Sequence, residues 1–462
     1  MILTALLLVP ASLPWAERQQ GATMEQGRGA EAASRVLKGA CYGPFRDNED
    51  PDRGVFPTLP ELQADIAFIK KVTGVIRTYG SASSPGRIPF LCDKAGIDCY
   101  PGAWLGKESI DNKKETDALI RIAGEKRPHV KGLIVGNEVL LRGDLTEAQL
   151  IEYIRQVKRS TTLPVTTAEI WGRWRKHPAL ADEVDFLLIH VHPYWEGIPV
   201  DRAAQHVVDA WKQIRDGAGG KRVVIGETGW PSRGGTRGRA VAGAENQARF
   251  MEDFLRLAAR EGIEYFWFDL FDEQWKSRFE GGVGAHWGIY NSDGSLKPHL
   301  KRLVPEAVRE GISRPPRKVE PVVVSAPLHV YVDGASEQNG FLPSGWMGDT
   351  ASIEIDRAHG VRPHSGESCI RITYDPSRSR RQGWAGIYWQ FPLNNWGEYP
   401  GYMLSGAARV TFWARGERGG ERAELKVGGI RSSGKPHRDS FGPISSGVIK
   451  LAQEWKKHTI DL

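Results

Sequence analysis

Two stretches decide the fold: KGLIVGNEV, residues 131–139, and KRVVIGETGWPS, residues 221–232. Each is an apolar run rich in β-branched residues, followed by a glycine and a glutamate, Glu138 in the first and Glu227 in the second. This composition is typical of a buried strand that opens into a loop. The glutamates are 89 residues apart, and one strand with its helix and loops takes roughly 30 residues in an eight-fold barrel. The spacing therefore predicts three strand–helix units between them, with both carboxylates on one rim of a parallel barrel.

Strand-like and helix-like segments alternate from Val36 to about Glu310. Strands that alternate with helices predict a parallel sheet, and eight such units fit a (β/α)8 TIM barrel. A doubly wound open sheet is the rival fold, but it calls for a phosphate-binding glycine loop after the first strand, and GACYGPF at 39–45 is not one. The expected strands are 36–42, 74–79, 98–104, 132–137, 164–168, 186–191, 222–227 and 265–269, and the expected helices include 60–71, 113–124, 146–160, 203–215 and 244–260.

The chain divides into four parts by composition. Residues 1–34 are a signal-like or flexible leader, 35–310 the barrel, 311–327 an extended linker rich in Pro, Val and charge, and 328–462 an all-β, jelly-roll-like sandwich. The sandwich is expected from short alternating segments such as HVYVDG (329–334), GIYWQFP (386–392) and ARVTFWARG (408–416). KKHTIDL at 456–462 is itself strand-like, so the pattern predicts an open edge and a truncated C-terminus.

The leader and the charge balance set expectations for location and partners. MILTALLLVPASLPWA, residues 1–16, resembles the apolar core of a signal peptide but lacks a preceding Lys or Arg, and it is too short for a stable membrane span. We expect a secreted, periplasmic or cell-envelope protein. The net charge of +6 is mild for 462 residues; basic clusters at 233–239 and 378–381 are interpreted as solvated loops, with attraction to an anionic envelope polymer as the alternative. No nucleic-acid motif is evident, and we expect a monomer.

The four cysteines are too few for a disulfide scaffold and have no zinc-site spacing. Cys92 and Cys99 flank a short turn and either form a bridge or stay as buried thiols. His190 and His192 share one face of a strand, which leaves a metal site as a minor alternative, although no third ligand is evident. We therefore expect no metal and no cofactor.

Two carboxylates that face each other are what acetal hydrolysis needs: one acid protonates the leaving oxygen, and a carboxylate attacks the anomeric carbon. A single strand-end glutamate is more often a helix cap or an ion-pair partner, but two of them in matching positions favour catalysis. Other strand ends supply aromatic and polar groups suited to a sugar, although the aromatic residues can also be barrel packing and Arg77 can also be a simple ion-pair partner. The candidate substrate-binding residues are Tyr42, Arg77, Tyr79, Asn137, His192, Tyr194, Trp230, Glu273 and Lys276.

GACYGPF, IRTYG, VGNEV, HPYW, GETGWPS and FDEQWK together resemble glycoside hydrolase family 17, from about Val36 to His299. The resemblance implies a (β/α)8 barrel and retention of anomeric configuration on β-1,3-glucans, with Glu138 as acid/base and Glu227 as nucleophile. It also matches Tyr42 to the tyrosine after the family's first strand, and Glu273 and Lys276 to residues that support the site. The motifs are closest to the fungal-wall and bacterial branch, which includes transglycosylases. The tryptophan-rich region 328–462 resembles, more weakly, a carbohydrate-binding domain, with a structural sandwich as the alternative.

The sequence thus predicts an endo-1,3-β-glucanase-like enzyme that works by double displacement through a glycosyl-enzyme, with β-glucan polysaccharide or oligosaccharide as its partner. Short segments after Trp104 and Trp195 favour an open, endo-type groove. The alternatives are a β-1,3-glucan transglycosylase, a non-catalytic glucan-binding envelope protein, and a barrel glycosidase for another β-linked polymer.

Overall fold

The computed structural model describes residues 36–462, apart from 319, 326, 335, 337, 380–381, 394, 398, 405 and 432–433 and the side chain of residue 278. The leader, 1–34, and part of the basic cluster at 378–381 lie outside these residues. None of the helices within the described residues is long and apolar enough to cross a membrane.

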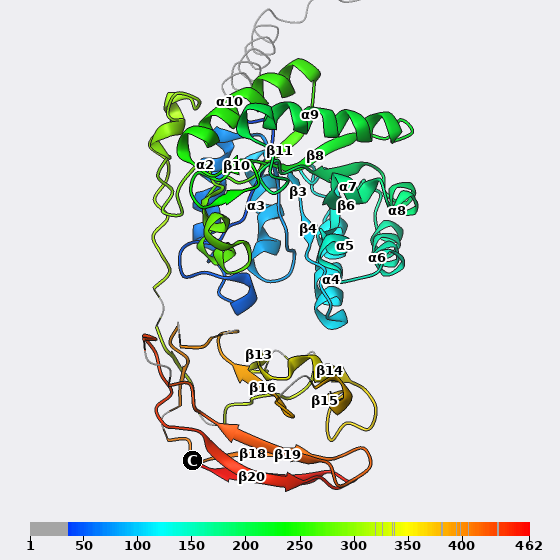
Figure 1. Ribbon diagram of the computed structural model, residues 1–462, viewed down its shortest axis with the longest axis vertical. Helices are drawn as coiled ribbons and strands as arrows, with labels where there is room; N and C mark the ends of the chain where they lie inside the picture. Colours follow the sequence, from blue (N-terminus) through cyan, green and yellow to red (C-terminus); the bar gives the residue numbers. More distant parts are fainter. Residues whose placement is uncertain are drawn as a thin grey trace, which may run out of the picture.

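Eight parallel strand positions close into a barrel, as the alternation predicts (Figure 1). The third position is split into β3 (Asp98–Tyr100) and β4 (Gly102–Ala103), because Pro101 between them has no N–H to give to a ladder. β3 pairs with β2 and β4 pairs with β5, so the split strand joins the two ends of the sheet and closes the ring. The other strands are β1 (Ala40–Cys41), β2 (Val75–Arg77), β5 (Leu133–Asn137), β6 (Val165–Ile170), β7 (Leu187–His190), β8 (Val223–Thr228) and β11 (Tyr265–Trp267).

Amphipathic helices cover the outside of the barrel and bury their apolar faces against it. The start of α6 shows why the sequence forms a helix there: Thr146 and Gln149 make the capping box that their spacing predicts, which satisfies two backbone N–H groups at the helix end. The helices are α2 (Leu59–Val72), α3 (Ile88–Ala95), α4 (Ser109–Gly124), α5 (Val139–Arg142), α6 (Glu147–Arg159), α7 (Trp171–Trp174), α8 (Pro178–Glu183), α9 (Val200–Gly217), α10 (Ala244–Glu261) and α11 (Ser277–Glu280), and a short β9–β10 hairpin (Thr236–Arg237, Ala240–Val241) precedes α10.

The first part of the expected linker, residues 311–317, packs against the barrel and is called the strap here. Arg314 is buried, forms an ion pair with Asp65 of α2 at 3.3 Å, and donates to the Pro44 carbonyl at 2.9 Å. Arg317 forms ion pairs with Glu49 at 2.5 Å and Glu61 at 2.8 Å. The strap therefore holds the loop between β1 and α2, and the chain after Arg317 leads on to β12 (Val322–Val323).

The C-terminal part of the chain is a β region, as expected, and lies below the barrel in Figure 1. Its strands form two-stranded ladders: β12 (Val322–Val323) with β17 (Tyr402–Met403), β13 (Leu342–Gly348) with β16 (Ala385–Gln390), β14 (Ile353–His359) with β15 (Cys369–Tyr374), β18 (Arg409–Ala414) with β21 (Lys456–Asp461), and β19 (Arg422–Val427) with β20 (Ile444–Lys450).

One expected strand of the β region, HVYVDG at 329–334, is irregular instead. The Asp333 carboxylate accepts from the backbone N–H groups of Glu367 and Ser368, at 2.7 and 3.0 Å, and Val332 N donates to the Asn339 side chain. These side-chain bonds take backbone groups that a strand ladder would use. β13, which contains SGWMG at 344–348, and β20 are strands that the expected segments do not include.

Two contacts join the β region to loops at the C-terminal ends of barrel strands. Arg357 forms an ion pair with Asp111 at the start of α4 and lies 3.6 Å from Glu108. The Arg53 guanidinium, in the loop after β1, lies 4.4 Å from the centre of the Tyr399 ring. Both contacts reach the rim of the barrel on which catalytic residues of such folds lie.

Candidate active site

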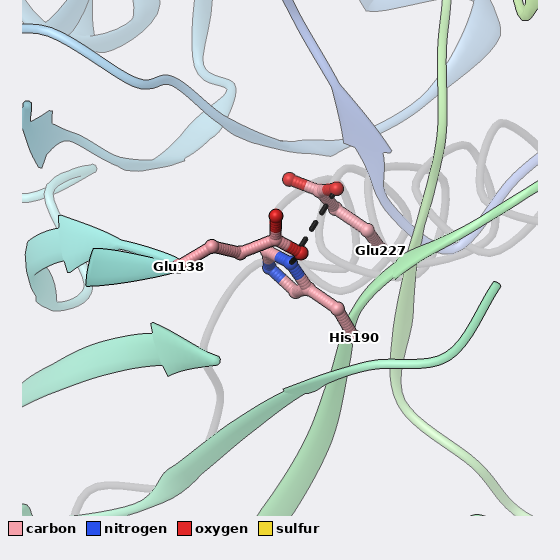
Figure 2. A group of neighbouring side chains, drawn as sticks. All are labelled: Glu138, His190 and Glu227. Carbon is pink, nitrogen blue, oxygen red and sulfur yellow. Dashed lines mark hydrogen bonds and ion pairs between the residues drawn. The ribbon is translucent and has the colours of Figure 1, made fainter. Parts of the chain in front are cut away.

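Glu138 and Glu227 reach the same rim from two different strands, as their spacing predicts. Glu138 directly follows β5, the fourth strand position, and Glu227 lies in β8, the seventh. Their carboxylates converge with the His190 ring from β7, and one oxygen of each glutamate and one nitrogen of His190 all lie within 4.8 Å of one another (Figure 2). Carboxyl groups about 5–5.5 Å apart are typical of retaining glycosidases, in which no water has to fit between them.

The backbone at the end of β5 aims Glu138 at its partner. Gly136 has φ 83° and Glu138 itself has φ 53°, a left-handed conformation that a non-glycine residue adopts at a cost. Glu138 N donates to the Ala168 carbonyl of β6 at 2.8 Å, which holds the turn in place. The Glu138 side chain is 22% exposed and the Glu227 side chain 6%, so Glu138 is the carboxyl more open to an incoming or leaving group.

Glu227 is held as a carboxylate. Burial alone would raise its pKa, but a 3.1 Å hydrogen bond from His192 Nε2 and the Arg77 guanidinium 3.4 Å from Oε1 lower it, and the pKa lies well below its usual range. A nucleophile must be ionised before it attacks. The surroundings of Glu227 therefore suit the role of nucleophile.

Arg77 is fully buried and orders its neighbours. Its Nη2 donates to Asn137 Oδ1 at 2.6 Å, and its Nη1 donates to His190 Nε2 at 2.7 Å. Because a guanidinium only donates, Asn137 must turn its oxygen toward Arg77, which directs its NH2 group away. By the same argument His190 Nε2 accepts from Arg77, which places the N–H of the ring at Nδ1, 2.8 Å from Glu138 Oε1.

Lys276, in the segment after β11, is the centre of a second buried group of charges. Its Nζ lies 2.7 Å from Asp269 and 2.5 Å from Glu273. Burial raises the pKa of Asp269 to about 7, against the lowering effect of Lys276 and with a raising contribution from Glu273. The Glu273 carboxylate lies where a side chain on Gly43 would stand, 2.2 Å from the ideal Cβ position, so the loop after β1 needs glycine there.

The structure divides the expected substrate-binding residues into two sets. Arg77, Asn137 and His192 lie beside the two glutamates, Tyr79 packs its half-buried ring 4.7 Å from the Arg77 guanidinium, and Glu273 and Lys276 form the buried ion pair described above. Tyr42, Tyr194 and Trp230 are buried in packing instead. Tyr42 donates to Asp65 of α2 at 2.8 Å, Tyr194 to the Gly235 carbonyl at 3.0 Å, and Trp230 to the Val241 carbonyl at 3.1 Å.

Sequence reasoning named His190 only as a minor metal-ligand alternative and left it out of the substrate-binding residues, whereas the structure places its ring beside both glutamates. Its signal was present: it precedes His192 by two residues, so both rings point into the barrel from the same strand end. Cys92 and Cys99 are free, buried thiols that lie within hydrogen-bonding reach of each other.

Glu138, His190 and Glu227 also have the spacing of a cation site. A metal needs an unprotonated nitrogen facing it. The His190 nitrogen that faces the glutamates is the protonated one, because Arg77 donates to the other. The donor set therefore fits a hydrogen-bonded carboxyl pair better than a metal centre.

A family model, the BtgE/BtgC glycoside hydrolase domain, matches residues 39–288, which is more than half of the chain. A probable glucan endo-1,3-beta-glucosidase btgC of Aspergillus fumigatus is 32% identical over 301 residues, covering 58% of this chain and 43% of the relative. The glucan endo-1,3-beta-glucosidase btgC of Emericella nidulans is 28% identical over 305 residues, covering 59% and 46%. The chain thus spans less than half the length of these curated relatives.

Solved structures agree on the fold. The glycoside hydrolase family 17 beta-1,3-glucanosyltransferase from Rhizomucor miehei is 31% identical, covers 57% of this chain and 96% of its own, and has a TM-score of 0.51. An endo-laminarinase from Formosa Hel1_33_131, at 21% identity and a TM-score of 0.51, supports the fold alone and covers 62% and 91%. The expected resemblance to family 17 is therefore confirmed, and the chain belongs to the BtgE/BtgC glycoside hydrolase family.

Proposed function

We propose that this protein is a retaining glycoside hydrolase that cleaves β-1,3-linked glucans within the chain, by double displacement. The observation that carries the proposal is the convergence of Glu138 and Glu227, with oxygens within 4.8 Å, around a Glu227 that its neighbours hold ionised. The names of the fungal relatives, which are glucan endo-1,3-beta-glucosidases, support the substrate and the endo mode of cleavage.

The geometry assigns a role to each carboxyl group. Glu227 attacks the anomeric carbon while Glu138 gives its proton to the departing glycosidic oxygen, and a covalent glycosyl-enzyme results. Glu138, now a carboxylate, then takes a proton from water, whose oxygen attacks the anomeric carbon and releases Glu227. The Asn137 NH2 group, fixed by Arg77, is placed to donate to a sugar hydroxyl beside the reacting carbon.

A second candidate is a β-1,3-glucan transglycosylase, in which a sugar hydroxyl replaces water in the second step. The specific observation in its favour is the solved family 17 beta-1,3-glucanosyltransferase, almost all of whose chain this protein covers at 31% identity. The same enzyme has a solved active-site mutant complex with laminaritriose, which makes β-1,3-linked oligosaccharides the natural first substrates to assay. A non-catalytic glucan-binding envelope protein is a third candidate. Binding alone does not need two facing carboxyl groups, one of which is held ionised by its neighbours, so the intact pair argues against it.

The deciding experiment is a time course on reduced laminarioligosaccharides with products resolved by size and linkage. Shorter products alone support the hydrolase, and products longer than the starting sugar support the transglycosylase. Glu227→Ala should lower turnover by on the order of 10³-fold or more, with partial rescue by azide to give a glycosyl azide of inverted configuration. The exposed Glu152→Ala on α6 is the matched control and should be as active as the wild type. An active Glu227→Ala enzyme would overturn the assignment.

The expected location belongs to the proposal as well. A polymeric glucan substrate and the signal-like residues 1–16 support a protein that is secreted, periplasmic or attached to the cell envelope. A protease-protection assay on intact cells tests this location. The expected monomer remains a prediction that light scattering can check.

A further inference from the structure

His190 lies between the two glutamates, and the two-carboxylate mechanism gives it no task. It ends β7, its side chain is fully buried, and its ring stands between the carboxylates that enter from β5 and β8 (Figure 2). Its Nδ1 lies 2.8 Å from Glu138 Oε1 and 3.5 Å from Glu227 Oε2. Among the described residues, no other lysine, arginine or histidine pairs with both glutamates, since Arg77 and His192 pair with Glu227 alone.

Arg77 decides which His190 nitrogen carries the proton. Its Nη1 lies 2.7 Å from His190 Nε2 and 3.1 Å from the Gly226 carbonyl, so it donates to two acceptors on that side. A proton on Nε2 would face the guanidinium N–H, so Nε2 accepts from Arg77 and the N–H of the ring is at Nδ1. That N–H points at the carboxyl pair and can only donate.

We propose that His190 is a positioning residue that fixes which oxygen of Glu138 carries the catalytic proton. Because Glu138 Oε1 accepts the Nδ1–H bond, the acid proton resides on Oε2, and the leaving glycosidic oxygen must meet Glu138 at Oε2. This inference rests on the proposed function, since it assigns a geometry to that same proton transfer.

The position of His190 between the two carboxylates gives it a part in both steps. In the free enzyme the negative charge is on Glu227, 3.5 Å from Nδ1. In the first step Glu227 forms a bond to the anomeric carbon as the glycosidic C–O bond breaks, and the Oε2 proton of Glu138 passes to the departing oxygen. The charge is then on Glu138, to which His190 already donates, so the N–H that orients the acid in the first step stabilises the carboxylate that serves as the base in the second.

Two substitutions separate the two ends of the imidazole. The side-chain nitrogen of asparagine stands where histidine has Nδ1, and the amide end of glutamine stands where histidine has Nε2. His190→Asn therefore keeps a donor toward Glu138, whereas His190→Gln keeps only a contact with Arg77. We expect His190→Gln to lower kcat/KM on laminarioligosaccharides on the order of 10²-fold, the cost of a misplaced acid, and His190→Asn to retain activity within about five-fold.

The readout specific to positioning is the dependence on the leaving group. A dinitrophenyl β-laminaribioside needs no proton to expel its phenolate, so both variants should form the glycosyl-enzyme from it at nearly the wild-type rate in the pre-steady state. His177→Asn, a partly exposed histidine on the edge of α8, is the control for the assay, and thermal melts check that each variant is folded. Equal losses in both variants, or equal losses on both substrates, would mean a structural role only and would overturn the proposal.

A second measurement reads the tautomer of His190 in the wild-type protein and needs a variant only to assign the signal. Nitrogen-15 NMR of the histidine side chains should show His190 with a protonated Nδ1 and an unprotonated Nε2, assigned by loss of the signal in His190→Asn. The opposite tautomer, or a doubly protonated ring at neutral pH, would overturn the inference. A wild-type protein that does not turn over laminarioligosaccharides would instead overturn the proposed function, while the tautomer would still test the geometry.

Discussion

The barrel and the β region have equally regular sequence patterns, yet only one of them builds a closed core. In the barrel, side chains as large as Trp230, Trp267 and Trp287 are buried. In the described residues of the β region, Pro392 and Ile460 are the two aliphatic or aromatic side chains that are buried. Trp346, 42% exposed, belongs to a two-stranded ladder whose outer face is open to solvent.

The difference shows how much of a fold a repeating sequence pattern of strands and helices specifies. A repeating strand–helix pattern closes on itself, so every barrel strand gains two neighbours and both faces of the sheet are covered. A repeat of short strands specifies hairpin ladders but not which ladders join into one sheet. The same substitution should therefore have unequal effects in the two regions.

The largest expected contrast is between ion pairs. Arg314→Ala removes a buried partner of Asp65 and should lower the free energy of unfolding of the barrel by about 3 kcal/mol. We expect no larger loss because Arg46 and Tyr42 still bond Asp65 in the variant. Arg378→Ala breaks an exposed pair with Glu354 in the β region and should leave the unfolding transition unchanged. Urea unfolding followed by tryptophan fluorescence and by activity separates the two parts. Equal midpoint shifts would contradict the proposed difference in burial.

A smaller contrast concerns pH. Glu169 on β6 is buried, and burial raises its pKa to about 7, with Glu138 adding to the rise and a 2.6 Å hydrogen bond from Leu140 N opposing it. The folded barrel therefore holds a proton on Glu169 that the unfolded chain, with a glutamate pKa of about 4.3, has already lost. Barrel stability should be complete below about pH 4 and should fall as the pH rises toward about 7.

Glu169→Gln tests this slope, because the amide mimics the protonated acid and its oxygen can still accept from Leu140 N. The variant should be more stable than the wild type at pH 8 and equally stable at pH 4. In the β region the carboxyl pKa of Glu424 is lowered instead, through hydrogen bonds from Ser445 and Lys426, so Glu424→Gln is a control without this slope. Parallel pH curves for wild type and Glu169→Gln would refute the assignment.

Much of the site could be predicted because strand ends in a parallel barrel share one rim. The distance of 89 residues between Glu138 and Glu227 translated directly into strand positions four and seven. What could not be predicted was the direction of neighbouring side chains. Tyr42 and Trp230 also lie at strand ends, but they point outward to partners on helices and hairpins, Asp65 for Tyr42 and the Val241 carbonyl for Trp230.

The sequence did not predict the packing of the strap or the hydrogen bonds of Arg77 to Asn137 and His190, for a different reason. Arg314 finds Asp65 across 249 residues, and Arg77 finds His190 across 113, so no local pattern marks either pair. The proline and charge content of residues 311–327 predicted an extended linker. Its buried arginine, Arg314, instead donates to several acceptors and thereby fixes residues 311–317 against the barrel. Long-range polar partners thus decide where the barrel ends.

The smallest expected effect lies on the exposed face of the β region, where Trp346 stands opposite Ile387. If this region binds glucan, as its tryptophan content suggests, Trp346→Ala should weaken binding to insoluble β-1,3-glucan by about 1 kcal/mol, or roughly five-fold in Kd, through loss of one aromatic face. Turnover of soluble laminarioligosaccharides should stay within about two-fold, because Trp346 is outside the carboxyl site and truncating an exposed side chain changes stability little.

Val361→Ala, at 60% exposure, is the matched control for loss of exposed apolar surface. A pull-down on insoluble glucan and a soluble assay on the same preparations compare the two effects. If Trp346→Ala and Val361→Ala bind alike, the open face of the β region is a structural surface, and recognition of the polymer belongs to the barrel alone.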